Sequence, residues 1–393
     1  MYDLFGYLQM MRDPVRMPVH EAAIRAVTRP GDIVLDLGAG AGVMGFLALR
    51  AGAARVYAVE TNDALVVADQ VAQANGLGER MICMREDIRR VELPEPVDLL
   101  IADIRGSLPL LGDNLSILAD ARRRFLRPGG RLIPLRDTIC VAPVECPNGR
   151  LSVEGWRARW GDTDYSLVSD LAGNQWRRFP LAAGDLLAPG ASMTSLDYLQ
   201  DPPAELVLDT GYRVERDGTC DGLGAWFEAL LAPALSFSTS PQGPETVYGH
   251  AYFPLTHRHP VGAGDTIAVN IRVHLAGKEP HWSWKVSFHA EGRPVAEERH
   301  SSFEGLLLSR DRLARRAAGF VPALDEEGEI DRFLLERMDG TRSLGEMARE
   351  AAARFPRHFP RWEEALGRAG MLSEKYGRRV PARPAPVPGG SRS

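Results

Sequence analysis

Residues able to hold a nucleotide-bearing ligand stand close together near the start of this 393-residue chain. An apolar run, Ile33–Leu37, leads directly into a glycine-rich turn, Gly38–Gly42, and then into a short segment of helical character. A second apolar run ends at an acid, Glu60. Glycines let the backbone approach a ligand closely, and a carboxylate at the end of the next strand accepts hydrogen bonds from a ribose diol. This spacing predicts a nucleotide-type cofactor at the edge of a parallel sheet.

Two details of the turn distinguish the candidate cofactors. Asp36 stands shortly before the first glycine, and no third glycine follows in the register of dinucleotide-binding turns. Both details favour S-adenosylmethionine (SAM) over NAD. The alternative is a turn that serves only packing in another nucleotide-type fold.

Alternating strands and helices must position this turn. The apolar runs typical of strands buried on both faces are Ile33–Leu37, Val56–Val59, Met81–Met84, Leu99–Ala102 and Arg131–Pro134. Helical periodicity occurs over Ala64–Asn75 and Ser116–Leu126, and Pro128-Gly129-Gly130 predicts a turn. The alternation predicts the α/β class, with a Rossmann-like, doubly wound domain over residues 1–139.

Two regions of different composition follow this domain along the chain. Residues 140–305 contain short β-rich segments: Thr246–Phe253, Thr266–Val273 and Trp282–Phe288. These predict an antiparallel β-barrel or sandwich, with a mixed helix and loop insertion at 162–199. Trp282 and Trp284 alternate there and are expected to pack on one face. Residues 306–376 predict a small helical domain, and the Pro-, Gly- and Arg-rich residues 377–393 predict a disordered tail.

Composition limits the class of protein. A hydrophobic content of 45% and a charged content of 25% are ordinary for a soluble globular protein. The net charge of −5 argues against a general nucleic-acid binder. The 4 cysteines form no CxxC pair, and the histidines between 257 and 289 lack partners at ligand spacing, so we expect no metal site. Neither a signal peptide nor a membrane-spanning run is recognisable, and we expect a cytoplasmic protein.

Several segments together resemble the protein arginine methyltransferase family of class I SAM-dependent methyltransferases. They are Asp13-Pro14-Val15-Arg16, Leu35–Gly40, Ala102–Gly106 and the Leu-x-Pro-Gly-Gly run at 126–130. The resemblance covers residues 1–300. It implies an enzyme that transfers a methyl group from SAM, and a β-barrel behind the Rossmann-like domain. It also implies a homodimer, with the insertion at 162–199 as the dimerisation arm.

The resemblance implies a set of cofactor-binding residues: Arg16, Asp36, Gly38, Gly40, Glu60, Asp87 and Ile88. Arg16 would pair with the carboxylate of SAM, because the two oxygens of a carboxylate match the parallel N–H donors of a guanidinium. Asp36 and the two glycines would line the methionine and ribose region, and Glu60 would bind the ribose hydroxyls. Asp87 and Ile88 would lie at the adenine edge. The alternative for Arg16 is a solvated surface arginine.

The acceptor residues depart from the family pattern. Arginine methyltransferases clamp a guanidinium between two glutamates on a hairpin after the fourth strand. Here Asp103, shorter by one methylene, occupies the first position, and Gly112, with Asp113 beside it, occupies the second. The family's Thr-His-Trp loop aligns with Thr246-Val247-Tyr248, so its histidine is absent. Asp103 and Asp113 are the candidate catalytic residues; the alternatives are a turn-capping acid for Asp103 and a helix N-cap for Asp113.

A weaker resemblance concerns the C-terminal helices. The sequence predicts a helix that ends at Asp339-Gly340, a capping box at Ser343–Glu346, and a further helix over Arg361–Ala369 that ends at Gly370. Together with Glu329–Gly340, these elements are similar to the helical part of PqqD-type domains. Those winged-helix modules bind leader peptides of ribosomally made peptides. The alternative is a helical cap on the enzyme.

The implied function is methylation of a nucleophile, with nitrogen favoured, on a peptide or protein, in ribosomal peptide modification. An amine, a carboxylate and a differently held guanidine all stay open as acceptors. The other functions left open are methylation of a small molecule and a catalytically inactive, SAM-binding peptide scaffold.

Overall fold

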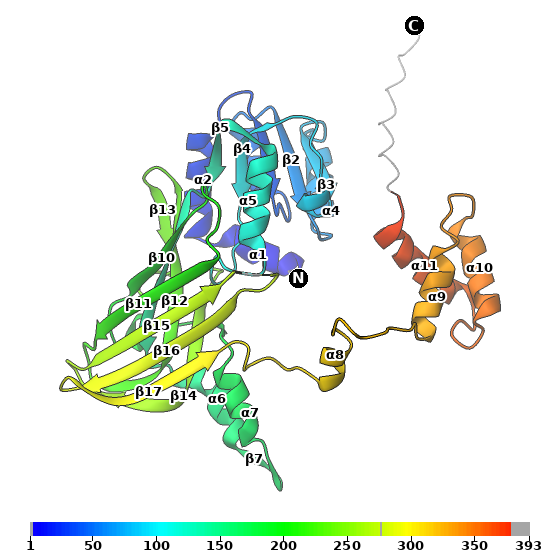
Figure 1. Ribbon diagram of the computed structural model, residues 1–393. Helices are drawn as coiled ribbons and strands as arrows, with labels where there is room; N and C mark the ends of the chain where they lie inside the picture. The colour runs from blue at the N-terminus through cyan, green and yellow to red at the C-terminus, as the bar shows by residue number, and fades with distance from the viewer. Residues whose placement is uncertain (1–2, 276, 379–393) are drawn as a thin grey trace. The chain divides into compact units, whose positions relative to one another are not determined.

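The computed structural model describes residues 3–275 and 277–378. The chain divides into two compact units, Met1–Leu306 and Leu307–Ser393 (Figure 1). None of the helices in the described ranges combines the length and the apolar character that crossing a membrane requires.

A five-stranded parallel sheet forms the first part of the larger unit. Its strands are β1 (Ile33–Leu37), β2 (Arg55–Glu60), β3 (Met81–Arg85), β4 (Val97–Ala102) and β5 (Leu126–Ile133). Their order is β3-β2-β1-β4-β5, so β1 lies at the centre. The apolar runs are buried on both faces, and Val34 and Leu35, which point to opposite faces, are both fully buried. The predicted Rossmann-like α/β arrangement is confirmed.

Helices cover both faces of this sheet. They are α2 (Arg16–Val27), α3 (Val43–Arg50), α4 (Leu65–Ala74), the short η1 (Ile88–Arg90) and α5 (Asn114–Phe125), while α1 (Leu4–Arg12) contacts α2. Ile24, Met44 and Ala68 from α2, α3 and α4 share one hydrophobic cluster with Val34. Leu118 of α5 belongs to the other cluster, which continues into the antiparallel sheets.

The predicted turn at Pro128-Gly129-Gly130 is wrong, because β5 runs through these residues. The pairing with β4 jumps from Val97↔Leu126 to Leu99↔Arg131, so β5 bulges there. Gly129 has φ +73°, which suits glycine in a bulge. Since β5 is the edge strand, Pro128 removes no ladder hydrogen bond that the sheet needs.

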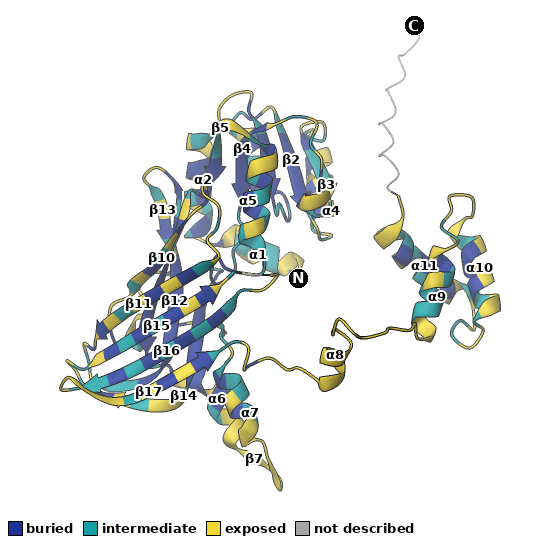
Figure 2. Cartoon of the chain, viewed as in Figure 1, coloured by how far each residue is buried: buried dark blue, intermediate teal, exposed yellow. Residues whose placement is uncertain are grey.

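Two antiparallel sheets complete the larger unit. The first has the order β10 (Ala191–Asp197), β6 (Arg136–Val144), β12 (Gly218–Ala232), β14 (His250–Val261) and β9 (Arg177–Phe179), with β13 (Leu235–Ser238) paired to β12. The second has the order β11 (Glu205–Arg213), β15 (Thr266–His274), β16 (His281–Ala290) and β17 (Arg293–Ser301). Buried and exposed residues alternate along these strands (Figure 2). Trp282 and Trp284 are buried together against Phe253, which confirms their predicted packing.

Two predicted boundaries in this region differ from the structure. Ala191–Asp197, expected within a mixed helix and loop insertion, is strand β10 paired to β6. Residues 246–249, expected in a strand, form a loop before β14. The arm projecting from the sheets is made of α6 (Pro147–Glu154), η2 (Gly155–Arg157), β7 (Arg159–Trp160), β8 (Thr163–Asp164) and α7 (Ser166–Gly173). The remaining short helix is η3 (Ala183–Asp185).

In its described residues, 307–378, the smaller unit consists of helices joined by turns and irregular segments and contains no strand. Its helices are α8 (Arg310–Ala314), α9 (Glu326–Leu335), α10 (Leu344–Arg354) and α11 (Trp362–Tyr376). The predicted capping box is confirmed, with the Ser343 hydroxyl and the Glu346 carboxylate exchanging hydrogen bonds with backbone N–H groups. The predicted end at Gly370 is wrong: α11 continues because Leu372 is buried on the same face as Ala369. The predicted tail lies, from residue 379 on, outside the described residues.

Candidate functional site

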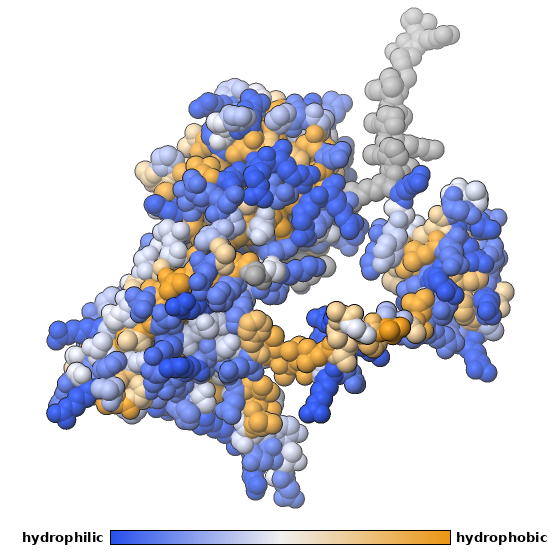
Figure 3. Space-filling model, viewed as in Figure 1, coloured by the Kyte–Doolittle hydropathy of each residue, from blue (hydrophilic) through white to orange (hydrophobic). Residues whose placement is uncertain are grey.

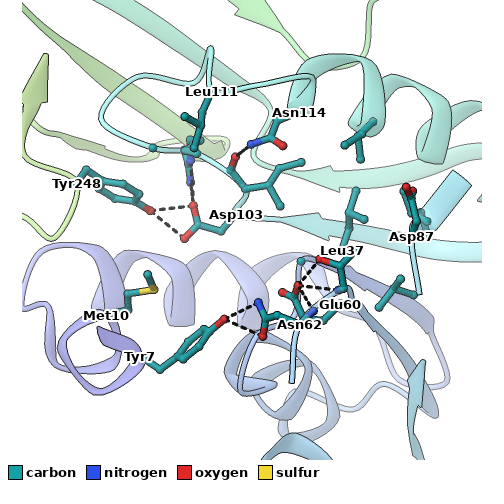
Figure 4. Close-up of a pocket in the computed structure, with 18 of the residues that line it drawn as sticks. Tyr7, Met10, Leu37, Glu60, Asn62, Asp87, Asp103, Leu111, Asn114 and Tyr248 are labelled. Atoms are coloured by element: carbon teal, nitrogen blue, oxygen red, sulfur yellow. Dashed lines mark hydrogen bonds and ion pairs between the residues drawn. The ribbon is translucent and has the colours of Figure 1, made fainter. Parts of the chain in front are cut away.

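A cavity of about 360 Å³ opens where the parallel sheet meets the antiparallel sheets. It lies at the carboxyl ends of β1, β2 and β4, the edge at which open α/β sheets bind ligands. Helix α1 and the loop before β14 supply further parts of its wall (Figure 4). Its volume is within the ordinary range of small-molecule sites, roughly 300–1,000 Å³.

The glycine turn forms one side of this cavity. Gly38 has φ +73°, and a Cβ there would collide with the side chain of Ile104. Gly40 has φ +53°, and a Cβ there would lie 2.5 Å from the ring of Tyr7. Both positions therefore require glycine, since an L side chain meets backbone strain and a neighbouring group at once. Gly38 lines the cavity, whereas Gly40 lies behind the wall.

Asp36 also lies behind the wall rather than on it. Its carboxylate is 2% exposed and accepts a hydrogen bond from the backbone N–H of Gly45 at 2.8 Å, near the start of α3. Burial raises the pKa of Asp36 to about 7. The observed contact is therefore one that holds the turn to the helix that follows it.

One end of the cavity, here called the cofactor end, is lined by Gly38, Glu60, Asn62, Glu86, Asp87 and Ile88. The Glu60 carboxylate accepts hydrogen bonds from the backbone N–H groups of Gly40 at 3.2 Å and Thr61 at 2.7 Å. Asp87 pairs with Arg89 at 2.6 Å. The predicted Glu60, Asp87 and Ile88 thus converge here, close to Gly38.

Tyr7 and Asn62 are site residues that the sequence did not reveal. Tyr7 lies on α1 and lines the cavity, and the Asn62 side-chain amide donates to its hydroxyl at 3.1 Å. This contact joins α1 to the loop after β2. The two residues are 55 positions apart, and neither belongs to a recognisable motif.

The opposite end, here called the acceptor end, is lined by Met10, Arg16, Asp103, Arg105, Arg178, Val247 and Tyr248. Asp103 is its centre, with a side chain that is 7% exposed. Arg16 Nη2 lies 2.5 Å from Asp103 Oδ2, and the Tyr248 hydroxyl lies 2.8 Å from both carboxylate oxygens (Figure 4). The structure therefore brings Arg16, predicted to bind the cofactor, together with Asp103, predicted to position the acceptor, and with Tyr248.

Asp13 connects this end to the antiparallel sheets. Its Oδ1 accepts a hydrogen bond from the backbone N–H of Arg16 at 2.8 Å, and its Oδ2 accepts one from that of Val247 at 2.6 Å. One buried carboxylate thus fixes the start of α2 against the loop before β14.

Arg105 contributes a second guanidinium that the sequence did not mark as important. Its Nη2 lies 3.0 Å from Asp103 Oδ1, and its Nη1 lies 2.9 Å from Asp137 Oδ1. The group is 4% exposed and lies 5.4, 5.6 and 5.8 Å from the ring centres of Phe227, Phe237 and Tyr248. A buried arginine requires a partner acid, and Asp137 stands 32 residues further along the chain.

These charges determine the protonation of Asp103. Burial alone would raise the pKa of Asp103, but the Arg16 and Arg105 guanidiniums outweigh it and hold that pKa well below its usual range. Burial lowers the pKa of the neighbouring His20 to about 4. His20 Nδ1 lies 2.8 Å from the backbone oxygen of Arg16. Asp103 is therefore ionised and His20 neutral near pH 7.

Asp113, the second candidate catalytic residue, does not lie beside Asp103 in the cavity. It occupies the N-cap position of α5, but its side chain makes no capping hydrogen bond. Its carboxylate instead pairs with Arg89 at 2.7 Å, and it does not line this cavity. Gly112, at the second position of the pattern, has φ +55°.

The described residues contain no group of His, Cys, Asp and Glu arranged to hold a metal ion. Three of the histidines, His257, His259 and His300, lie around one buried carboxylate, that of Glu298.

Comparisons with known proteins agree with this geometry. Residues 21–134 match the family model of ribosomal protein L11 methyltransferase (PrmA). Histone-arginine methyltransferase CARMER of Anopheles gambiae is 31% identical over 268 residues, 62% of this chain and 42% of that protein. Probable protein arginine N-methyltransferase 6 of Arabidopsis thaliana is 34% identical over 167 residues, 42% of this chain and 38% of that protein. The chain spans about two fifths of the length of these curated relatives.

Solved structures share the fold. The Trypanosoma brucei PRMT1 enzyme–prozyme heterotetrameric complex with AdoHcy superposes with a TM-score of 0.68 at 17% identity, over 75% of this chain and 97% of that one. Arabidopsis thaliana protein arginine methyltransferase 10 gives a TM-score of 0.68 at 20% identity, over 76% of this chain and 97% of that one. The chain therefore has the fold of protein arginine methyltransferases, which confirms the predicted architecture.

Proposed function

We propose that this protein is a SAM-dependent methyltransferase that modifies a nucleophilic atom of a peptide or protein. The observation that carries the proposal is the cavity itself. It places a ribose-type carboxylate, Glu60, and the close-approach glycine, Gly38, at one end and a buried guanidinium, Arg16, at the other. The relatives that share sequence with this chain are named as arginine methyltransferases.

The residues present fit SAM. Glu60 would accept hydrogen bonds from the ribose hydroxyls, and Arg16 would pair with the amino-acid carboxylate. Gly38 lines the cavity and carries no side chain, so its backbone can approach a nucleoside closely. When bound, SAM would supply an electrophilic methyl group on a sulfonium sulfur. The protein would contribute orientation, because an in-line displacement depends strongly on positioning.

Calorimetric titration of the full-length protein with S-adenosylhomocysteine (AdoHcy) tests the cofactor assignment. We expect saturable binding at one site per chain. A folded protein that binds neither AdoHcy nor SAM would contradict the proposal. Transfer of labelled methyl groups from SAM to peptides then tests the activity, and binding without transfer would favour the inactive scaffold.

We propose that the helical unit recognises the peptide, as in the modification of ribosomally made peptides. Its helices expose apolar side chains, including Leu335, Leu344, Met371 and Tyr376, that a peptide can contact. PqqD-type domains add a peptide strand to a sheet edge, whereas the described residues 307–378 contain no strand. Recognition would therefore use helix surfaces. Exposed apolar residues also follow β17 (Figure 3).

Deleting residues 307–393 tests this role. The larger unit has its own core, so we expect AdoHcy affinity to stay within about twofold of that of the full chain. Methylation of a long peptide should fall at least about tenfold in kcat/KM, which corresponds to roughly 1.4 kcal/mol of lost recognition. Equal kcat/KM values for the two proteins, measured with the same peptide, would show that the unit is structural.

We also propose a homodimer formed through the arm, in the cytoplasm. The arm exposes Leu151, Trp160 and Leu167, whose exposed fractions are 63%, 70% and 77%. Several large, exposed apolar side chains on one projecting arm favour a role for it in association. Light scattering should give twice the chain mass, and the double variant Trp160→Asp/Leu167→Asp should give the chain mass. Val295→Asp, at a 62% exposed position on β17, is the matched control and should stay dimeric.

A further inference from the structure

The carboxylate of Asp103 is already fully engaged by the protein. Its Oδ2 accepts from Arg16 Nε at 2.7 Å, its Oδ1 accepts from Arg105 Nε at 3.0 Å, and the Tyr248 hydroxyl lies 2.8 Å from each oxygen. Arg16 Nη2 makes a further contact with Oδ2 at 2.5 Å. Because the Arg16 and Arg105 guanidiniums already pair with Asp103, a third guanidinium would have to displace one of them.

No second acid supports it at the acceptor end. The hairpin position that would carry one is Gly112, and the adjacent Asp113 does not line the cavity; it pairs with Arg89, which lines the cavity beside Asp87. The other acids that line the cavity, Glu60, Glu86 and Asp87, belong to the cofactor end. Among the described residues, Asp103 is thus the single acid that lines the acceptor end, while Asp13 and Asp137 contact the lining residues without lining the cavity themselves.

Arg178 is the arginine of this end that no described carboxylate offsets, whereas Arg16 pairs with Asp103. Arg16, Arg105 and Arg178 all line the acceptor end. Arg105 is partly neutralised from behind by Asp137. Arg178, on β9, is exposed, donates to the backbone oxygen of Val247 at 2.6 Å, and forms no ion pair with a described carboxylate. At the mouth of the cavity, Arg178 would repel an incoming cation and attract an incoming anion.

We infer that the acceptor is a carboxylate on a peptide or protein, which the reaction converts to a methyl ester. Arg178 would attract the acceptor at the mouth of the cavity, and the Tyr248–Asp103–Arg105 network would form the wall against which it is positioned. The inference rests on the proposed SAM-dependent transfer, and it departs from the nitrogen acceptor that the sequence favoured.

The chemistry of such an acceptor matches the groups present. One carboxylate oxygen uses a lone pair to form a bond to the methyl carbon while the carbon–sulfur bond breaks. The electron pair of the broken bond goes to sulfur, so the products are the ester and neutral AdoHcy. No proton is transferred, so no general base is required. Asp103, held ionised by two arginines, and the buried, neutral His20 are poorly suited to act as one.

The test uses the full-length protein, SAM and short capped peptides that carry a single arginine, lysine, glutamate or aspartate in otherwise identical random flanks. Mass spectrometry detects the added methyl group, and mild alkali removes it only from an ester. We expect base-labile methylation of the acidic peptides. Calorimetry with AdoHcy-loaded protein gives a second readout, in which acidic peptides should bind at least about tenfold more tightly than the arginine peptides.

Arg178 provides a charge-reversal test. Arg178→Glu should lower kcat/KM for the acidic peptides about five- to tenfold, as expected for reversing one exposed charge at the rim of a site. Arg178→Gln should give a smaller loss, and AdoHcy binding should stay unchanged in both variants. Arg213→Glu is the matched control, because Arg213 is an exposed arginine on β11 that does not line this cavity.

Each outcome is decisive. Base-stable methylation of arginine or lysine peptides would overturn the inference while leaving SAM-dependent transfer intact. A failure to methylate or to bind the acidic peptides, by a protein that binds AdoHcy, would also overturn it. Loss of AdoHcy binding in the unmodified protein would instead contradict the proposed function.

Discussion

Replacing Asp103 by alanine is expected to lower the free energy of unfolding of the larger unit by about 3–5 kcal/mol. The reason is the buried network around it. Without Asp103, Arg105 still has Asp137, but the 9%-exposed guanidinium of Arg16 loses its carboxylate. An uncompensated buried charge of this kind is among the most destabilising changes available. Urea unfolding followed by the fluorescence of buried tryptophans such as Trp226 and Trp282 measures the change.

The same substitution should reduce methyl transfer about a hundredfold, because Asp103 fixes Arg16, Arg105 and Tyr248 at the acceptor end. Asp103→Glu keeps the charge and should restore most of the stability, although its extra methylene displaces the network. Asp113→Ala is the matched control for stability. Because its partner Arg89 is half exposed, the free energy of unfolding should fall by less than about 1 kcal/mol. An Asp103→Ala protein as stable and as active as its parent would show that the network is dispensable.

Predicting the fold from the sequence succeeded where one local signal decided the structure. The five apolar runs became five parallel strands because burial on both faces leaves a continuous hydrophobic run. Prediction failed where distant packing overrode a local signal. Gly370 is a helix breaker by propensity, yet α11 continues to Tyr376 because Leu372 joins the helical core. Pro128 suggested a turn, yet an edge strand tolerates it.

For the candidate site, too, the sequence predicted some features and missed others. Gly38, Glu60, Asp87, Arg16 and Asp103 stand in local patterns with a chemical meaning, and all line the cavity. The charge balance of the acceptor end could not be read from those patterns, since it depends on pairs far apart in the chain. Tyr248 contacts Asp103 across 145 positions, and Arg105 contacts Asp137 across 32. A pattern identifies which acid stands at a position, but only the assembled sheets determine whether that acid is free to bind a substrate.

Replacing Glu60 by alanine should weaken AdoHcy binding about a hundredfold, and calorimetry of the purified variant measures it. Two hydrogen bonds from ribose hydroxyls to a charged acceptor account for roughly 3 kcal/mol after the loss of hydration is included. The site supports such an arrangement because Glu60 lies at the end of β2, with its carboxylate already oriented by the N–H groups of Gly40, Thr61 and Asn62.

Those same backbone contacts mean that Glu60→Ala can also loosen the glycine turn, so a conservative variant is required. Glu60→Gln keeps one acceptor oxygen for the N–H of Thr61 but removes the charge, and its loss of AdoHcy affinity should be nearer tenfold. Asp63→Ala is the matched control, since Asp63 follows closely in the chain, is 75% exposed and does not line the cavity. If the Glu60→Ala protein shows unchanged thermal unfolding and unchanged AdoHcy affinity, the ribose of the cofactor does not bind at Glu60. The nucleoside would then have to lie elsewhere in the cavity, where Glu86 and Asp87 also line the cofactor end.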